Sequence, residues 1–144
     1  IAPGHLYGSI APALLVDGMR QAIKRSNAKI LYVCNLVTKP GQTDGFMVHD
    51  YAQEIERFIG EASLDIVLYS NEQPDAEVLQ RYTAEGEHWV GYDLDVMKNK
   101  HYQAIGANLL SNEDVVQKAS DKLIKRNLIR HDGQKIAALI SSLV

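Results

Sequence analysis

Two kinds of hydrophobic spacing alternate along the chain, one typical of helices and one typical of buried strands. Apolar side chains recur every three or four positions over 9–25, 48–59 and 134–144, which predicts three amphipathic helices. The continuous apolar runs KILYVC at 29–34 and LDIVLYS at 64–70 predict strands that are covered on both faces. The alternation therefore predicts an α/β fold, a parallel sheet with helices on both of its faces.

Turn and cap signals place the ends of several elements. Ser9 is expected to cap the first helix, with Pro12 in its first turn and Gly18 as an interruption. Gly60 is expected to end the second helix. Weaker patterns predict a helix over 74–85, strands over 88–93 and 103–109, a helix over 112–125 and an extended piece over 127–132.

The length and the first residues bear on domain organisation. The chain has 144 residues, 46% of them hydrophobic, which is enough for one compact core and one domain. It opens on IAPGHLYGSIAP, a pattern typical of a strand end followed by a loop. We therefore expect residues 1–144 to be the C-terminal part of a larger domain, with its N-terminal portion missing. Residues 1–15 would then expose apolar surface, which favours self-association into a homo-oligomer.

Charge and cysteine content exclude several classes of protein. The formal net charge of −3 argues against a broad nucleic-acid footprint, which would need a basic face, although one local phosphate pocket remains compatible. No apolar run approaches the ~18 residues of a membrane helix. Cys34 is the only cysteine, so no intramolecular disulfide is possible, and this favours a cytoplasmic location.

Two polar loops follow the ends of expected strands, where open α/β sheets bind ligands. The loop over 2–9 brings Gly4 and backbone amides to a helix start, a favourable place for an anion. The loop over 35–45 adds Asn35, whose amide suits a base or sugar edge, and Asp44, whose carboxylate suits a hydrated Mg²⁺. The same residue types also form ordinary turns, and Asp44 could cap a helix, so both interpretations stay open.

Catalytic signatures are absent from the sequence. The five histidines show no metal-ligand spacing, and PGHLYGS lacks the G-K-[ST] ending of a P-loop. Cys34 has no histidine in evident register for nucleophilic catalysis and is expected to be a small core residue. Whether the protein is an enzyme therefore stays open.

The two loops lie within longer motifs that resemble those of the CofD-like family. APGHLYGSIAPALLVDGMRQAI, followed by KILYVCNLVTKPGQTDGF, is similar to the C-terminal half of that family. The similarity continues through NEQPDAEVLQRYTAEGEHWVGYD and ends at LIRHDGQKIAALI. The motifs most resemble the branch of YvcK-type gluconeogenesis factors. His5, Gly8 and Lys39 depart from that pattern, in which Ser, Thr and Gln are usual.

The resemblance implies a Rossmann-like fold and a nucleotide-type ligand. The YvcK-type branch is linked to carbon metabolism, to cell shape and to binding of UDP-sugars, so it implies a nucleotide-sugar-binding regulatory protein. The alternative is the 2-phospho-L-lactate transferase of the family, which uses a guanosine nucleotide and a deazaflavin. Matching positions imply these ligand-binding residues: Gly4, Leu6, Tyr7, Ser9, Asn35, Thr38, Asp44, Tyr92 and Arg130.

Several of these residues have a purely structural interpretation. The implied role of Arg130 is a phosphate clamp, but it could instead form a surface ion pair with Asp132. Tyr7 and Tyr92 also suit packing positions. A third hypothesis is an inert fragment or interaction module whose missing half holds the other wall of the cleft. The function implied by the resemblance requires Gly4, Asn35 and Arg130 to share one cleft.

Overall fold

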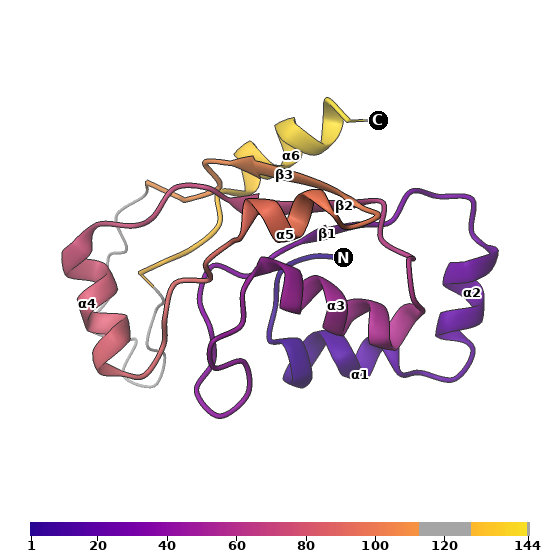
Figure 1. The fold of residues 1–144 in the computed structure, drawn as a ribbon, viewed down its shortest axis with the longest axis horizontal. Coiled ribbons are helices and arrows are strands. Elements are labelled where there is room, and N and C mark those ends of the chain that lie inside the picture. Colours follow the sequence, from indigo (N-terminus) through magenta and orange to yellow (C-terminus); the bar gives the residue numbers. More distant parts are fainter. Residues whose placement is uncertain (113–127, 144) are drawn as a thin grey trace, which may run out of the picture.

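The fold is described by a computed structural model that covers residues 1–112 and 128–143. Three strands form one parallel sheet in the order β1-β2-β3 (Figure 1). In the register, Leu31 pairs with Ile66, and Ile66 pairs with Gln103. The predicted parallel sheet is confirmed. The strand bounds are β1 Leu31–Val33, β2 Ile66–Ser70 and β3 Gln103–Ala107.

Helices cover both faces of the sheet, as the alternating pattern predicted. Helix α6 lies on one face, and α1, α3 and α5 lie on the other, while α2 and α4 lie toward opposite ends of the molecule (Figure 1). A short π-helix, η1, leads directly into α1. The helix bounds are η1 Leu6–Ile10, α1 Ala11–Leu14, α2 Met19–Arg25, α3 Val48–Ile59, α4 Ala76–Ala84, α5 Leu94–Lys98 and α6 Gly133–Ser141.

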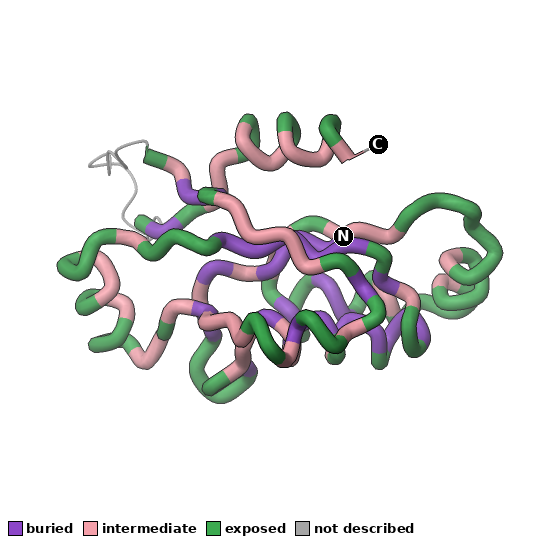
Figure 2. The backbone as a smooth tube through the Cα atoms, turned by 45° about the horizontal axis from the view of Figure 1, so that its top comes forward, coloured by how far each residue is buried: buried purple, intermediate pink, exposed green. Residues whose placement is uncertain are grey.

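The central strand β2 explains why the sequence has a continuous apolar run. All five of its residues are buried. Alternate side chains of a strand point to opposite faces. Val67 and Tyr69 accordingly join the core beside α3, and Ile66 and Leu68 join the core beside α6. Figure 2 shows buried positions concentrated in the sheet and in the helices next to it.

Helix α3 forms as its spacing predicted. Its buried side chains include Val48, Ile55 and Ile59, which share the face toward the sheet. The carboxylate of Asp50 accepts a hydrogen bond from the backbone N–H of Met47 at 2.8 Å, in the first turn, where a negative charge is favourable. Gly60 follows the helix with φ of 120°, so the expected stop is confirmed.

The first helix differs from the expectation of one element over 9–25. Ser9 caps nothing, because the π-helix already begins at Leu6. The backbone N–H groups of Ser9 and Ile10 both donate to the His5 carbonyl, at 2.8 and 3.0 Å. Helix α1 ends at Leu14, and Gly18, in a left-handed conformation with φ of 83°, stands at the N-cap of α2. Burial of Leu6 and Ile10 against the core accounts for the earlier start.

The strand expected over 88–93 is wrong. Trp89 makes only an isolated antiparallel bridge with Val37, because this segment hydrogen-bonds to the loop after β1 instead of entering the sheet. Helix α5, which no pattern predicted, then begins at Leu94, and the carboxylate of its N-cap residue Asp93 accepts hydrogen bonds from two backbone N–H groups. The helix expected over 112–125 lies, apart from its first residue, outside the described residues. The strand near 103–109 and the helices near 74–85 and 134–144 are confirmed with small shifts of their ends.

The N-terminal residue lies beside β1. The ammonium group of Ile1 donates to the Leu31 carbonyl at 2.5 Å, and the Ile1 carbonyl accepts from the Val33 N–H at 3.0 Å. This pair of bonds has the pattern of a parallel bridge.

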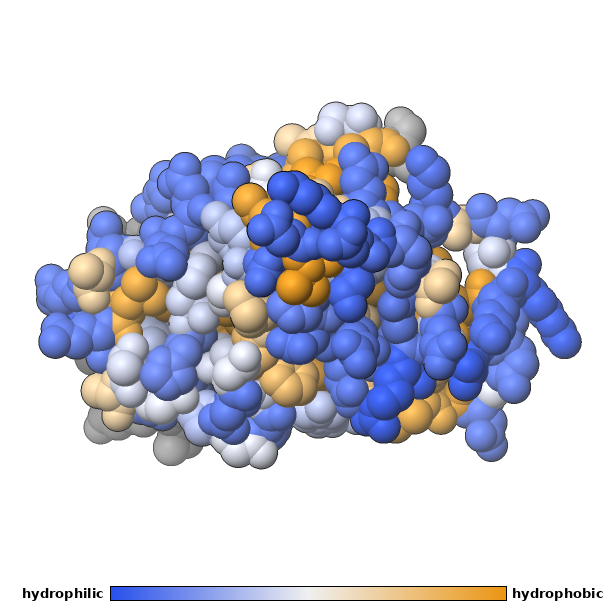
Figure 3. Space-filling model, viewed as in Figure 1, coloured by the Kyte–Doolittle hydropathy of each residue, from blue (hydrophilic) through white to orange (hydrophobic). Residues whose placement is uncertain are grey.

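Apolar exposure is confined to a few positions. Leu15 and Val16 are 63% and 57% exposed, whereas Leu6 and Ile10 are buried. Figure 3 shows a largely hydrophilic face with separate small hydrophobic areas. Among the described residues, every helix is too short or too polar to reach across a bilayer.

Hydrogen bonds connect the segment before α6 to the residue that follows β1. Leu110 and His131 form an isolated antiparallel bridge, and the Nε2–H of His131 donates to the Cys34 carbonyl at 3.1 Å. Burial lowers the pKa of His131, although the bond to Cys34 acts in the opposite direction. His131 therefore joins two parts of the chain in its neutral form.

Replacement of Leu68 by Ala tests the role of the central strand. We expect Leu68→Ala to lower the free energy of unfolding by about 2–5 kcal/mol, because Leu68 is fully buried and truncation leaves a cavity. Urea denaturation measures this change. The control Leu15→Ala, at an exposed position, should stay within about 0.5 kcal/mol of the wild type. Equal effects of both changes would contradict the assignment of β2 as the core strand.

A second prediction concerns pH. The pKa of His131 is lowered from 6.5 in the folded protein, so the unfolded chain binds its proton more tightly. The stability from neutral His131 is complete above the unfolded pKa and is lost as pH falls through the folded pKa. As pH falls below about 6.5, the free energy of unfolding should fall more steeply for the wild type than for His131→Gln, as measured by urea denaturation at each pH. Parallel pH profiles would count against this linkage.

Candidate functional site

A cleft opens at the carboxyl end of β1. Its volume is about 490 Å³. Gly4, Asn35 and Arg130 all line it, although they come from distant parts of the chain. The cleft is lined by Pro3, Gly4, His5, Leu6, Asn35, Leu36, Val37, Thr38, Lys39, Gln42, Thr43, Tyr51, Glu87, Ile129, Arg130 and His131.

Asn35 holds the first loop against the end of β1. Its side-chain Nδ2 donates to the Gly4 carbonyl at 2.7 Å, and the hydroxyl of Tyr32 donates to its Oδ1 at 3.2 Å. The sequence suggested that this amide reads a base or sugar edge. Its observed contacts are within the protein, which leaves one N–H of Nδ2 for any ligand. Asn35 thus sets the position of the loop backbone.

The first loop delivers backbone amides to the rim of the cleft. The first backbone N–H of η1 that forms a helical hydrogen bond is that of Ser9, which donates to the His5 carbonyl. The N–H groups of Leu6, Tyr7 and Gly8 therefore precede the first helical donor. Gly4, His5 and Leu6 line the cleft, so the helix start faces the same region.

The second loop is held in shape by two buried threonines. Thr43 Oγ1 accepts from the Lys39 N–H at 2.8 Å and from the Tyr51 hydroxyl at 2.9 Å. Thr38 Oγ1 accepts from the His88 N–H at 2.9 Å. Both hydroxyls thus accept hydrogen bonds that connect the loop to other parts of the chain. Thr38 lines the cleft and at the same time anchors the segment that follows α4.

Some charged side chains of the cleft form ion pairs within the protein, and one does not. Lys39 and Glu87 face one another across it, with Nζ and Oε1 separated by 2.9 Å. Arg130 is exposed, and its guanidinium forms no hydrogen bond or ion pair with residues 1–112 or 128–143. Asp132 caps α6 through the N–H groups of Gln134 and Lys135. The alternative of an Arg130–Asp132 ion pair is therefore not what the described residues form.

His131 lines the cleft and contacts the backbone of Cys34, which lies in the core behind it. Burial raises the pKa of the Cys34 thiol to about 12, so it stays protonated at neutral pH. Cys34 is fully buried in the core, which confirms its expected packing role. His131 lines the cleft and donates from Nε2 to the Cys34 carbonyl. A neutral His131 with this tautomer keeps Nδ1 as an acceptor.

Four of the nine implied ligand-binding residues lie outside this cleft. The Tyr92 ring packs on the Tyr69 ring with centroids 4.8 Å apart, the structural interpretation left open by the sequence. Tyr7 and Ser9 are exposed on the π-helix, and Glu54 near the Tyr7 hydroxyl adds to the rise that burial causes in the Tyr7 pKa. Asp44 is exposed in its loop and caps no helix, since α3 has Met47 at its N-cap.

The carboxylate suggested for Mg²⁺ therefore does not reach the cleft. Asp44 is not among the lining residues, and Glu87, which is, pairs with Lys39. Within 1–112 and 128–143, no three histidine, cysteine or acidic side chains gather as a metal site. The groups in the described lining that can attract an anion are thus the backbone amides and the cations of Lys39 and Arg130.

Glu87 and His131 are lining residues to which the sequence assigned no ligand role. His131 follows Arg130 directly, so its position in the RHD motif was a usable signal. Glu87 lies 48 positions from Lys39, and nothing in its local sequence indicates that they meet. The antiparallel bridge between Val37 and Trp89 and the hydrogen bonds between Thr38 and His88 bring this part of the chain to the cleft.

Comparisons with known proteins relate the chain to a group of longer proteins. It is 41% identical over 138 residues to the "Putative gluconeogenesis factor" of Thermotoga maritima, covering 96% of this chain and 41% of that protein. It is 30% identical over 144 residues to the "Gluconeogenesis factor" of Bacillus subtilis, covering 100% of this chain and 42% of that protein. The chain thus spans less than half the length of these curated relatives.

A solved structure and a family model agree with these similarities. A crystal structure of a UPF0052 family protein from Bacillus halodurans superposes with a TM-score of 0.81 at 29% identity. The superposition covers 98% of this chain and 42% of that one, so the chain corresponds to part of a larger fold. The model described as "2-phospho-L-lactate transferase CofD" matches residues 1–110. On that match over most of its length, the chain belongs to the CofD family.

Proposed function

We propose that the cleft binds a nucleotide-sugar, of the UDP-sugar kind, and that the protein acts through this binding as a regulatory factor. The observation that carries the proposal is that Gly4, Asn35 and Arg130 line one cavity. Its volume of about 490 Å³ lies within the range usual for small-molecule sites. The cleft also lies beyond the carboxyl end of β1, where open α/β sheets place their ligands.

Arg130 is the proposed partner of the phosphates. Its guanidinium offers planar, paired donors that suit a phosphate better than a point charge does. It is exposed at the cleft, so little structure must break before it can bind an anion. Lys39 supplies a second cation on the opposite loop, where it pairs with Glu87. The backbone amides at the start of η1 add further donors.

The remaining wall suits the less charged part of a nucleotide. Leu36, Val37 and Ile129 contribute apolar surface to the cleft. Thr38 and Thr43 are already hydrogen-bonded to the protein, so they shape this wall without leaving unpaired polar groups. A base and ribose would then lie along the loop after β1 while the phosphates lie near Arg130.

The similarity to the gluconeogenesis factors supports a regulatory role in carbon metabolism, with the link to cell shape as part of the same proposal. Nucleotide-sugars are formed in the cytoplasm, so the proposal places the protein there. The cleft residues described above explain binding, and none of them is assigned a bond-making step.

A second candidate function is the transferase reaction of the family. The observation in its favour is the match of residues 1–110 to the model described as 2-phospho-L-lactate transferase. This candidate uses the same cleft but requires a guanosine nucleotide and a deazaflavin acceptor. The base of the bound nucleotide therefore distinguishes the two.

Arg130→Ala tests the phosphate clamp. We expect it to weaken binding of UDP-N-acetylglucosamine by about 1.5–3 kcal/mol, because a hydrogen bond to a charged group is lost. Isothermal titration calorimetry of the full-length protein measures the affinity. The control Arg81→Ala removes an exposed arginine that pairs with Glu77 on α4, and it should leave the affinity unchanged. If the wild-type protein does not bind UDP-N-acetylglucosamine, the proposal is wrong.

A nucleotide panel separates the two candidates. If the proposed function holds, UDP and UDP-sugars should bind at least about tenfold more tightly than GDP, a difference of about 1.4 kcal/mol. Calorimetry with UDP, GDP and UDP-N-acetylglucosamine measures this ratio. Preferred binding of the guanosine nucleotide, together with turnover of a deazaflavin acceptor, would instead establish the transferase.

A further inference from the structure

A second cavity continues the first along the edge of the sheet. Its volume is about 500 Å³. Ile129 and Arg130 line both cavities, so the two meet at these residues. Whereas the first cavity lies at the end of β1, the second lies beyond the ends of β2 and β3. Its lining comprises Glu72, Gln73, Pro74, Asp75, Val78, Asn108, Leu110, Ser111, Asn112, Leu128, Ile129 and Arg130.

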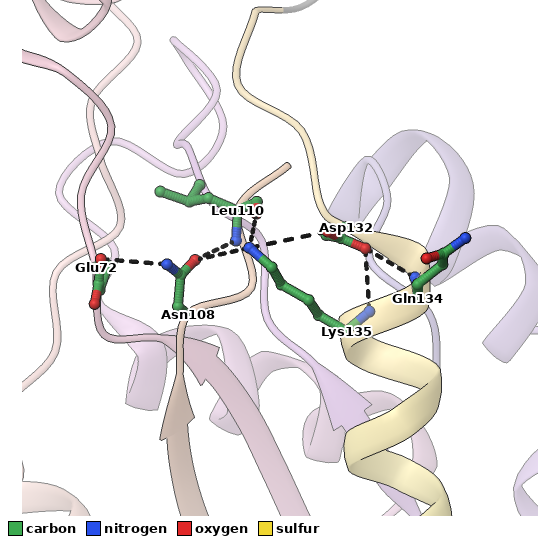
Figure 4. A network of polar contacts seen from close by, with 6 residues as sticks. All are labelled: Glu72, Asn108, Leu110, Asp132, Gln134 and Lys135. Carbon is green, nitrogen blue, oxygen red and sulfur yellow. Dashed lines mark hydrogen bonds and ion pairs between the residues drawn. The ribbon is translucent and has the colours of Figure 1, made fainter. Parts of the chain in front are cut away.

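A polar network fixes the wall of this second cavity (Figure 4). Asn108 lies at its centre, just after β3. Its Nδ2 donates to Glu72 Oε2 at 3.3 Å, and its Oδ1 accepts from the Leu110 N–H at 3.1 Å. Lys135 on α6 donates from Nζ to the Leu110 carbonyl at 2.7 Å and lies 3.9 Å from Asp132 Oδ2. The ends of β2, β3 and the start of α6 are therefore held together, and Glu72 is held at the rim.

The carboxylate of Asp75 does not form the hydrogen bonds that its position at the start of a helix would allow. It stands at the N-cap of α4, yet it accepts no hydrogen bond from the first turn of that helix. Asp93 and Asp132, at the same position of α5 and α6, each accept two backbone N–H groups. Asp75 lines the cavity instead, so its oxygens remain able to accept hydrogen bonds there.

The two cavities differ in the sign of their charge. The described lining of the first includes Lys39 and Arg130 with one carboxylate, Glu87. The second includes the carboxylates of Glu72 and Asp75, with Arg130 at the junction. Carboxylates close to a phosphate repel it, but they are strong acceptors for hydroxyl groups. A ligand with phosphates at Arg130 would therefore extend a neutral, hydroxyl-rich part into the second cavity.

We infer that the second cavity binds the neutral, polyhydroxylated group that a nucleotide carries beyond its phosphates, with Glu72 and Asp75 accepting hydrogen bonds from its hydroxyls. This inference rests on the proposed function, because it needs the nucleotide to occupy the first cavity. Asn108 is a positioning residue, since it holds Glu72 and its own amide is already engaged on both sides. Arg130, shared by both cavities, holds the phosphates between the two halves.

The test compares UDP with UDP-N-acetylglucosamine on the full chain by isothermal titration calorimetry. For the wild type, the sugar-bearing ligand should bind more tightly than UDP. Glu72→Gln and Asp75→Asn should each reduce this affinity ratio by about tenfold, because a charged acceptor is lost, and should leave the affinity for UDP itself within about twofold. The matched control Glu77→Gln changes a carboxylate on α4 that does not line the cavity, and it should alter neither affinity.

The other outcomes are distinguishable. Tight binding of UDP with no gain from the sugar overturns this inference and leaves the nucleotide site intact. Equal loss of affinity for both ligands in Glu72→Gln and Asp75→Asn, with α-helical circular dichroism unchanged, also overturns it, because the carboxylates would then act on the nucleotide half. Binding of neither ligand by the wild type overturns the proposed function and this inference with it.

Discussion

Burial of β2 on both of its faces is the constraint on which the rest of the structure depends. A strand covered on two sides must be apolar along its whole length, and its neighbours must present apolar side chains in matching register. The pairing of β1 and β3 with β2 in parallel brings the carboxyl ends of all three strands to one edge. The segments that follow β1, β2 and β3 all contribute residues to the two cavities at that edge.

Once the strand ends are fixed, short-range hydrogen bonds determine the shape of the cleft. Asn35 joins the first loop to the end of β1, and Thr43 closes the second loop on itself. His131 ties the last segment to the Cys34 carbonyl. Each bond satisfies a polar group that would otherwise be unpaired near the core, so the contacts that shape the cleft also stabilise the fold.

Charge divides this edge into regions with different chemistry. Lys39 and Arg130 make the first cavity suitable for an anion, while Glu72 and Asp75 make the second suitable for hydroxyl donors. Arg130 stands at the boundary because it precedes His131, which bridges to Leu110 just after β3. A single residue can therefore contact the middle of an elongated ligand whose two ends differ in polarity.

The sequence alone determined the parallel α/β architecture, the buried strands and the helix over 48–59, because period and apolar content report directly on burial. It also located the two loops around Gly4 and Asn35. The tertiary structure decided which side chains meet: Glu87 reaches Lys39, and the ring of Tyr92 packs on the ring of Tyr69. These outcomes depend on contacts between residues far apart in the chain, and the failed strand over 88–93 has the same cause. Local spacing carries no information about such contacts, since they arise only when the sheet edge brings separate segments together.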